Sequence, residues 1–393
     1  MSVTFFLEPS ERIQNLPPYL FIEIDRAKRQ ARERGVDVID FGVGDPDLPT
    51  PPFVLRAMAR HLKDAANHHY PLDRGNGAFR RAASAWCRKR FGVTFNPDTE
   101  VLPLIGSKEG IAHLPLAFLN PGDLVLVPDP CYPPYRSGPL FAGADVHLMP
   151  LREEKGFLPE LELIPDEMAR KAKFIYVNYP NNPTGAVATR AFYDKLVKWA
   201  AARQILIVSD LAYSEVYLGA DKPPSVFEVP GAMDTAVEFH SLSKTCNMTG
   251  WRIGFAVGEE NVIDALLKVK SNMDSGVFTA IQKTAIDALA KSRAFSRRMN
   301  RVYRRRRDRL VAGLKRLGFP VKPNPATFYV FTRLPGGFKD STAFCRELLE
   351  KTGIVATPGV GFGRAGEGYV RFALTVTEAR IREALTRMEK SFF

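Results

Sequence analysis

Polar residues that could do chemistry follow four of the short apolar runs in the middle of the chain. Asp210 comes after ILIVS, Asn182 after FIYVNYPN and Lys244 after VEFHSLS, while Gly106-Ser107-Lys108 follows VLPLI. In an open α/β sheet, ligands bind outside the carboxyl ends of the strands, so these positions are candidates for one site. A lysine amine can act as a nucleophile, and a carboxylate can stabilise a cationic group beside it. Singly, each residue also has an ordinary explanation: a helix cap for Asp210, a tight turn at Asn182 and a surface position for Lys244.

The elements that must position these residues can be read from the apolar pattern. Several runs are continuous rather than alternating, which indicates strands covered by helices on both faces. Helical patterns lie between some of them, such as residues 189–203. The pattern predicts an α/β domain with a seven-stranded, mainly parallel sheet between helices. The seven runs are residues 101–105, 124–127, 146–149, 174–178, 205–209, 237–240 and 253–257.

After about residue 260 the pattern changes to long helices and two isolated strand-like runs, which predicts a smaller α+β domain. The N-terminal segment, with Pro17-Pro18 and a helix at 20–34, is expected to pack beside it. The predicted division is an N-terminal segment at 1–55, a large domain at 56–285 and a small domain at 286–393. The late helices are expected at 262–271, 295–317 and 378–392, and the strands at 328–333 and 369–374.

The chain has a formal net charge of +12. A basic excess can serve nucleic acid, a membrane surface or anionic small molecules. Much of it is local, because eight arginines lie between Arg297 and Arg309 in RRMNRVYRRRRDR. A helix there would spread them around most of its circumference. The sequence favours a solvated or subunit-facing helix over a nucleic-acid footprint, since no recognition motif accompanies it.

The cysteines and the apolar runs indicate where the protein works. The four cysteines lie far apart with no C-x-x-C pair, which is typical of free thiols in a reducing cytosol and indicates neither disulfides nor zinc. No stretch approaches the roughly 20 apolar residues that span a bilayer, and the first ten residues do not resemble a signal peptide. We therefore expect a cytoplasmic protein with no metal site and no membrane partner.

Together the motifs resemble a known family. NNPTG, SDLAY and SLSKTCNMTGWRIG occur in the order, and at about the spacing, found in the class I and II aminotransferases of the pyridoxal-phosphate fold type I superfamily. The resemblance extends over nearly the whole chain, from FGVGDPDLPTP to GYVRFALT. It implies an enzyme that moves an amino group from an amino acid to a 2-oxo acid by ping-pong chemistry, with pyridoxal 5'-phosphate as cofactor.

The resemblance assigns catalytic roles. Lys244 matches the lysine that carries the cofactor as an aldimine and later acts as general base. Asp210 would keep the pyridine nitrogen protonated, so that the ring serves as an electron sink. Tyr213 and Asn182 match the residues that donate to the phenolic oxygen of the ring.

Other residues would bind the cofactor phosphate and ring. Gly106-Ser107-Lys108 begins a predicted helix, whose free N-H groups and positive dipole end suit a phosphate. Arg252 matches the phosphate-binding arginine of the family, and Ser241 and Ser243 offer hydroxyls, although loop capping would also explain these serines. Tyr132 matches the aromatic residue that stacks on the ring, with a core position near a proline turn as the alternative.

Substrate binding is predicted for Arg371, Gly44 and Asn182. An arginine within the apolar strand YVRFALT needs a partner, and a bidentate carboxylate is the natural one. Arg371 matches the α-carboxylate arginine of the family, and Gly44 would let the backbone approach the same carboxylate. Tyr70 resembles the tyrosine that members contribute to the phosphate of a neighbouring subunit, which implies a homodimer with composite sites.

Two positions depart from the family pattern. Cys131 stands where glycine is common, and Cys246 stands where a bulkier residue often follows the lysine. Neither belongs to the core chemistry, but both are expected to bear on pocket shape.

Within the family, GSKEGIAHLPLAFLNPGD and GIVATPGVGFGRAGEGYVRFALT most resemble the LL-diaminopimelate aminotransferase group, which would place the chain in lysine biosynthesis with 2-oxoglutarate as acceptor. Aspartate, alanine or aromatic specificity stays open, as does a pyridoxal-phosphate C-S β-lyase. A DNA-binding regulator built on this fold is a further alternative. Such a regulator would need a winged-helix domain ahead of residue 41, and the forty residues that precede it are too few for one.

Overall fold

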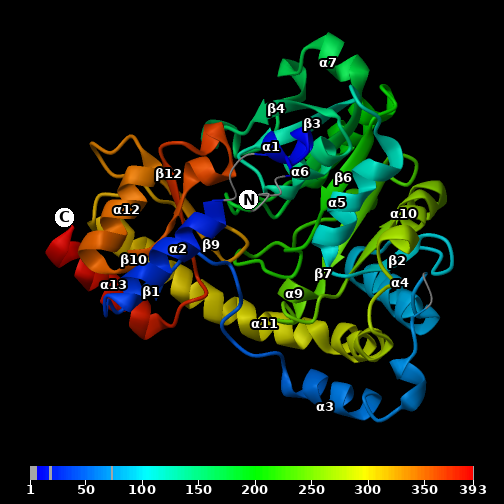
Figure 1. The fold of residues 1–393 in the computed structure, drawn as a ribbon, viewed down its shortest axis with the longest axis horizontal. Helices are drawn as coiled ribbons and strands as arrows, with labels where there is room; N and C mark the ends of the chain where they lie inside the picture. The colour runs from blue at the N-terminus through cyan, green and yellow to red at the C-terminus, as the bar shows by residue number, and fades with distance from the viewer. Residues whose placement is uncertain (1–6, 17–19, 72–73, 393) are drawn as a thin grey trace, which may run out of the picture.

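A seven-stranded sheet forms the centre of the larger part of the molecule in a computed structural model, which describes residues 7–16, 20–71 and 74–392 (Figure 1). The strand order is β2-β8-β7-β6-β5-β3-β4. Strand β8 is antiparallel to both neighbours, and the remaining pairs are parallel. All seven predicted runs are strands of this sheet. They are β2 (Val101–Leu104), β3 (Leu124–Asp129), β4 (Asp145–Pro150), β5 (Ala172–Asn178), β6 (Leu206–Asp210), β7 (Ala236–Ser241) and β8 (Gly254–Gly258).

Helices cover both faces of the sheet, which explains why the strands are continuously apolar. Along β5, Ile175 and Val177 join one apolar cluster, while Phe174 and Tyr176 join the cluster on the opposite face. The first face is covered by α4 (Gly77–Phe91), α8 (Arg190–Ala201) and the beginning of α11 (Thr279–Arg316). The second is covered by α5 (Ser107–Phe118), α6 (Pro134–Phe141) and α10 (Glu260–Met273).

A smaller α+β part lies beside the large sheet, as predicted. Its three antiparallel strands are ordered β11-β12-β9, and a separate parallel pair joins β1 to β10. The N-terminal segment therefore pairs with a strand from near the other end of the chain. The elements are α2 (Leu20–Glu33), β1 (Ile39–Asp40), β9 (Tyr329–Arg333), α12 (Ser341–Thr352), β10 (Ile354–Val355), β11 (Thr357–Pro358), β12 (Tyr369–Ala373) and α13 (Glu378–Ser391).

Helix α11 extends from the large sheet to the smaller part as one long rod (Figure 1). It packs on α3 (Pro52–His61) and α4, and also on α13. It begins sixteen residues before the predicted start at residue 295, because small residues such as Ala285 and Ala288 continue its buried face. The predicted domain boundary at residue 285 falls inside this helix, and that division stays a prediction.

The arginine cluster of α11 is only partly exposed to solvent. Arg306 and Arg307 are buried, and Arg304 and Arg307 donate to the carbonyl oxygen of Leu218. Much of this positive charge therefore stabilises contacts within the chain. The remaining short helices are α1 (Glu11–Gln14), α7 (Asp166–Lys171) and α9 (Leu242–Thr245). In the ranges that the structure describes, no helix has both the length and the apolar character needed to cross a membrane.

Candidate active site

A cavity of about 540 Å³ opens at the carboxyl edge of the large sheet. Strands β5, β6 and β7 are parallel, so they end at the same edge; β2 ends there too, because it is antiparallel to β8, which is antiparallel to β7. This topology brings most of the predicted site residues together. Those that line the cavity are Gly44, Ser107, Lys108, Tyr132, Asn182, Asp210, Tyr213, Ser241, Ser243, Lys244, Arg252 and Arg371.

Asp210 is the last residue of β6 and lies almost fully buried in the floor of the cavity. Tyr135 donates to its Oδ2 over 2.7 Å, and the backbone N-H of Ala212 donates to its Oδ1 over 3.1 Å. Asn178, at the end of β5, donates to its backbone carbonyl over 2.7 Å. Burial raises the pKa of Asp210, while the bonds from Tyr135 and Ala212 oppose that shift. A cationic group in the cavity would stabilise this carboxylate further.

Lys244 lies in the short helix α9, directly after β7. Its Nζ donates to the carbonyl oxygen of Gly44 over 3.1 Å and lies 5.4 Å from the centre of the Phe328 ring. Burial lowers the pKa of Lys244 to about 8, and the cations Arg252 and Arg371 act in the same direction. A substantial fraction of the amine is therefore neutral near physiological pH, as a nucleophile or general base requires.

The turn between β2 and α5 forms one end of the cavity. Gly106 caps α5 with a φ of 78°, and a Cβ at this position would lie 2.3 Å from Nη2 of Arg252. Arg252 donates to the carbonyl oxygens of Thr249 and Ile105 over 2.8 and 3.4 Å. Burial lowers the pKa of Lys108, and the neighbouring Arg252 adds to this shift. The first-turn N-H groups of α5, Lys108 and Arg252 thus concentrate positive potential at this end.

Arg371 lines another part of the cavity, which we call the Arg371 end. It is 1% exposed and belongs to β12. Its Nη1 donates to Oδ1 of Asn182 over 2.8 Å, and its Nη2 donates to the carbonyl oxygen of Gly42 over 2.7 Å. Its guanidinium carbon lies 4.1 Å from the centre of the Tyr329 ring. These contacts fix the plane of the guanidinium group at the cavity wall.

Two tyrosines that line the cavity contact each other. The hydroxyls of Tyr213 and Tyr329 lie 2.9 Å apart, and burial raises the pKa of both groups. Tyr329 also leaves no room for a side chain at Gly44, where a Cβ would lie 1.9 Å from its hydroxyl. Glycine is therefore required at position 44 for the segment to pass this close to Tyr329.

Two predicted residues are placed differently from the rest. Gly106 lies behind Arg252 rather than among the residues that line the cavity. Tyr70 is 87% exposed and does not line the cavity of its own chain. Its predicted contribution to a neighbouring subunit stays a prediction. Cys131 and Cys246, the two positions that depart from the family pattern, are buried free cysteines that do not line the cavity. Any effect of these two side chains on pocket shape must therefore be indirect.

Eight further residues line the cavity that the sequence reasoning did not single out: Val43, Asp45, Tyr135, Asn178, Ala212, Thr249, Gly250 and Tyr329. Asn178 ends the run FIYVN, so the rule that identified Asp210 also applies to it. Tyr135 lies three residues after Tyr132 in the same proline-rich turn. Tyr329 had no comparable signal, because it reads as an ordinary strand aromatic.

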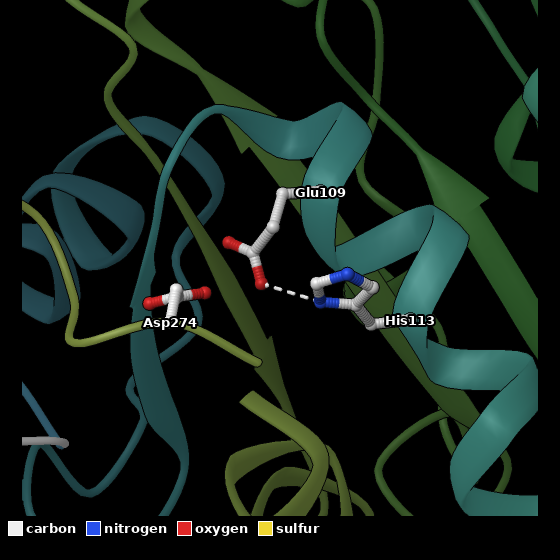
Figure 2. Close-up of side chains that lie close together, drawn as sticks. All are labelled: Glu109, His113 and Asp274. Atoms are coloured by element: carbon white, nitrogen blue, oxygen red, sulfur yellow. Dashed lines mark hydrogen bonds and ion pairs between the residues drawn. The ribbon is translucent and has the colours of Figure 1, made fainter. Parts of the chain in front are cut away.

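A group of three potential metal ligands lies behind the β2-α5 turn. Figure 2 shows Glu109 and His113 on one helix, joined by a hydrogen bond of 3.1 Å, with Asp274 facing them from another segment. The ammonium of Lys270, 2% exposed, lies 3.4 Å from Glu109 and 2.7 Å from Asp274. This buried lysine supplies the positive charge that a metal ion would otherwise provide. Glu109 also accepts from the N-H of Ile105 over 2.9 Å, so the group supports the turn next to Gly106.

Comparison with known proteins agrees with this geometry. The family "Aminotransferase class I and II" matches residues 36–388. The chain is 51% identical to the LL-diaminopimelate aminotransferase of Aquifex aeolicus, over 97% of this chain and 98% of that protein. The substrate-bound structure of BacF from Bacillus subtilis superimposes with a TM-score of 0.95 at 37% identity, covering 98% of both chains. A double mutant of Thermus thermophilus aspartate aminotransferase gives 0.91 at 30% identity, covering 98% of this chain and 99% of that one. The chain therefore belongs to the class I and II aminotransferases, a family of pyridoxal-phosphate enzymes.

Proposed function

We propose that this aminotransferase holds pyridoxal 5'-phosphate on Lys244 and exchanges amino groups between LL-diaminopimelate and 2-oxoglutarate. The observation that carries the site assignment is the convergence of Lys244, Asp210, Arg252 and Arg371 on one cavity. The cofactor, when bound, supplies an electron sink for the bond that breaks at the substrate Cα. The chain itself supplies the binding groups, the charges and the proton transfer.

The cavity floor fits the ring of this cofactor. Asp210 is a buried carboxylate whose pKa is raised by burial, so a protonated ring nitrogen is the partner that would best stabilise its charged form. Tyr135 and Ala212 hold the carboxylate in place by hydrogen bonds. We assign Asp210 to the ring nitrogen, and Asn182 and Tyr213 to the phenolic oxygen. Tyr132 lines the same cavity and supplies an aromatic surface for stacking.

The β2-α5 end fits the phosphate. Gly106 leaves no room for a side chain beside Arg252, so the backbone and the guanidinium form one compact anion site. Ser107, Ser241 and Ser243 add hydroxyls to the cavity wall. An arginine, helix N-H groups and hydroxyls are the donors that a dianionic phosphate requires.

Lys244 would also move the proton. The pKa of about 8 that burial gives this amine leaves it able to accept a proton from the substrate Cα once it is free. Arg371 would bind the α-carboxylate, because its guanidinium is held in a fixed plane by Asn182 and Gly42. Gly44 permits the close approach of the neighbouring backbone. These assignments place the α-carboxylate at one end of the cavity and the phosphate at the other.

Among the possible substrates we favour LL-diaminopimelate as amino donor. Relatives that bear this name are about half identical to the chain over nearly its full length, whereas the aspartate aminotransferase structure is 30% identical. The test measures 2-oxoglutarate-dependent consumption of LL-diaminopimelate beside aspartate, alanine and phenylalanine. If the protein does not turn over LL-diaminopimelate, the proposed substrate is wrong. Release of pyruvate and ammonia from cystathionine without an oxo-acid acceptor would instead identify a C-S β-lyase.

We also propose a homodimer with composite sites. Tyr70 is 87% exposed, and the family resemblance assigns it to the phosphate of the neighbouring subunit. Sedimentation of the purified protein tests the dimer. Mixing a Tyr70→Phe chain with a Lys244→Ala chain tests the sharing. Only one composite site in each mixed dimer would then carry both substitutions, and the other would be intact, so activity should reappear on mixing.

A further inference from the structure

Arg306, in the middle of α11, makes a buried contact that the aminotransferase chemistry does not explain. It is 4% exposed, and its two terminal nitrogens donate to the two carboxylate oxygens of Asp47 over 2.7 and 2.8 Å. Its Nη1 also donates to the carbonyl oxygen of Leu374 over 2.9 Å. The Asp47 side chain is 22% exposed, so the pair is largely shielded from water. A bidentate arginine-carboxylate pair fixes position and plane as well as charge.

Asp47 belongs to a segment that crosses the Arg371 end of the cavity. We call residues 42–48 the strap. Its carbonyl oxygens are held one after another: Gly42 by Arg371 and by Thr357, Val43 by Thr375, and Leu48 by Asn247. The strap has no helix or strand of its own, so these side-chain contacts determine its path. It carries Gly44 and Asp45, which line the cavity.

Leu374, the second partner of Arg306, lies three residues after Arg371 and directly follows β12. Its N-H donates to the carbonyl oxygen of Phe328, next to Tyr329, over 2.7 Å. Arg306 therefore holds two segments at once. One carries Gly44, and the other carries Arg371. Movement of either segment would change the distance between the guanidinium of Arg371 and the strap backbone.

We propose that Arg306 is a positioning residue for substrate carboxylate binding, acting through Asp47 on the strap and through Leu374, which directly follows β12. This inference rests on the proposed function, in which Arg371 binds the α-carboxylate. Arg306 does not line the cavity and is not expected to touch substrate or cofactor. Its loss should therefore weaken binding of carboxylates at the Arg371 end. The phosphate site at the β2-α5 turn should change little. The strap also contacts Lys244 through the carbonyl oxygen of Gly44, so kcat should change as well, but less than carboxylate binding does.

The main test compares Arg306→Lys and Asp47→Asn with a matched surface pair whose arginine lies on the same helix. Lysine keeps the charge but cannot make the bidentate contact. We expect the KM for L-glutamate and 2-oxoglutarate to rise about tenfold or more, with kcat changed less than about threefold. The Kd of glutarate, a dicarboxylate with no amino group, should rise by a similar factor in calorimetry. Arg305→Lys and Glu378→Gln, an exposed pair whose arginine is 63% exposed, should leave all three constants unchanged.

A double-variant cycle separates this role from general destabilisation. Arg306→Lys combined with Asp47→Asn should be no weaker in glutarate binding than the worse single variant, because both remove the same contact. The visible absorbance of the cofactor should be retained in every variant. Should Arg306→Lys fail to fold, Asp47→Asn alone decides, because it preserves the shape of the side chain.

Three results would overturn the inference. They are unchanged KM and glutarate Kd in both Arg306→Lys and Asp47→Asn, a fall confined to kcat, or additive effects in the double variant. Failure of the proposed function is visible beforehand and is distinct. In that case the unaltered protein would show no visible cofactor band, or its Lys244→Ala variant would keep one.

Discussion

Arg371 donates from Nη1 to the side-chain oxygen of Asn182 over 2.8 Å. The bond connects β12, in the three-stranded sheet, with the loop after β5, in the seven-stranded sheet. Both residues line the cavity, so the proposed carboxylate site is shared between the two parts of the molecule. Its geometry depends on how these parts are held together.

The first prediction concerns Arg371→Lys. Lysine cannot bind a carboxylate through two parallel hydrogen bonds, nor keep the contacts with both Asn182 and Gly42. We expect kcat/KM to fall about 10- to 100-fold, since hydrogen bonds to charged groups are worth about 1.5–3 kcal/mol. Steady-state kinetics with both half-reaction substrates measures this. Arg333→Lys on neighbouring β9, where the side chain is 51% exposed, is the control and should retain full activity.

The second prediction concerns Asp210→Asn. We expect activity to fall at least about 100- to 1,000-fold, by analogy with the loss of one preorganised electrostatic group. Burial raises the pKa of Asp210 in the folded protein above the ordinary value of 3.8. Between these two pKa values, Asp210 is protonated more in the folded protein than in the unfolded chain. The free energy of unfolding therefore falls as the pH rises from 3.8 through the folded pKa of Asp210, because the buried carboxylate becomes charged.

Asp210→Asn should accordingly raise the free energy of unfolding of cofactor-stripped protein at neutral pH. The gain should shrink as pH falls below the folded pKa and disappear below 3.8, where aspartic acid is neutral in both states. Denaturant melts across this range measure the difference. Lower stability of the variant at neutral pH would contradict the burial argument.

The third prediction concerns the amine of Lys244. Its pKa is about 8, against an ordinary 10.5. The reactive neutral amine therefore forms at a much lower pH than it does in a surface lysine. Uptake of pyridoxal phosphate by cofactor-stripped protein should therefore increase with pH around a midpoint near 8. The growth of visible absorbance measures the rate. Asp45→Asn should shift the midpoint downward, because the charge of Asp45 raises the pKa of Lys244; an upward shift would be inconsistent with this arrangement.

The fourth prediction concerns the buried ammonium of Lys270. Lys270→Met leaves Glu109 and Asp274 without their shared cation, and removal of one partner from a buried pair typically costs about 3–5 kcal/mol. We expect a loss near the lower value, because both carboxylates keep some contact with water. Cofactor retention should also weaken, since Glu109 holds the N-H of Ile105 beside Gly106. Urea titration and equilibrium dialysis measure the two effects. Lys171→Met, in an exposed pair with Glu167, should change neither.

The sequence allowed the large sheet to be predicted because its strands are covered on both faces. Residues such as Phe174 and Ile175 are therefore both apolar, and the run stands out against its surroundings. Asp210 and Lys244 were identifiable because each is a polar residue placed directly after such a run. Topology then brought these strand ends to one edge. The family motifs added Arg252 and Arg371, which lie far apart in the chain.

The supporting contacts could not be predicted from the sequence. Arg306 is one of eight neighbouring arginines, and only the position of Asp47, 259 residues away, distinguishes it. In the sequence, Tyr329 looks like an ordinary strand aromatic. Only the structure shows that its hydroxyl contacts Tyr213 and leaves no room for a side chain at Gly44. The start of α11 was also predicted too late, because the first sixteen residues of the helix are alanine-rich turns with weak apolar periodicity.

Helix α11 has a consequence for dividing this protein by engineering. Its 38 residues extend roughly 57 Å at the usual rise per residue. Its buried side chains belong both to the apolar cluster on one face of the large sheet and to the apolar core of the smaller part. A gene split at residue 285 would leave Ala288 and Leu289 on one fragment and their packing partners on the other. Each isolated fragment would therefore expose apolar side chains that promote aggregation. Co-expression and reassembly, rather than separate refolding, is the route by which such halves should recover activity.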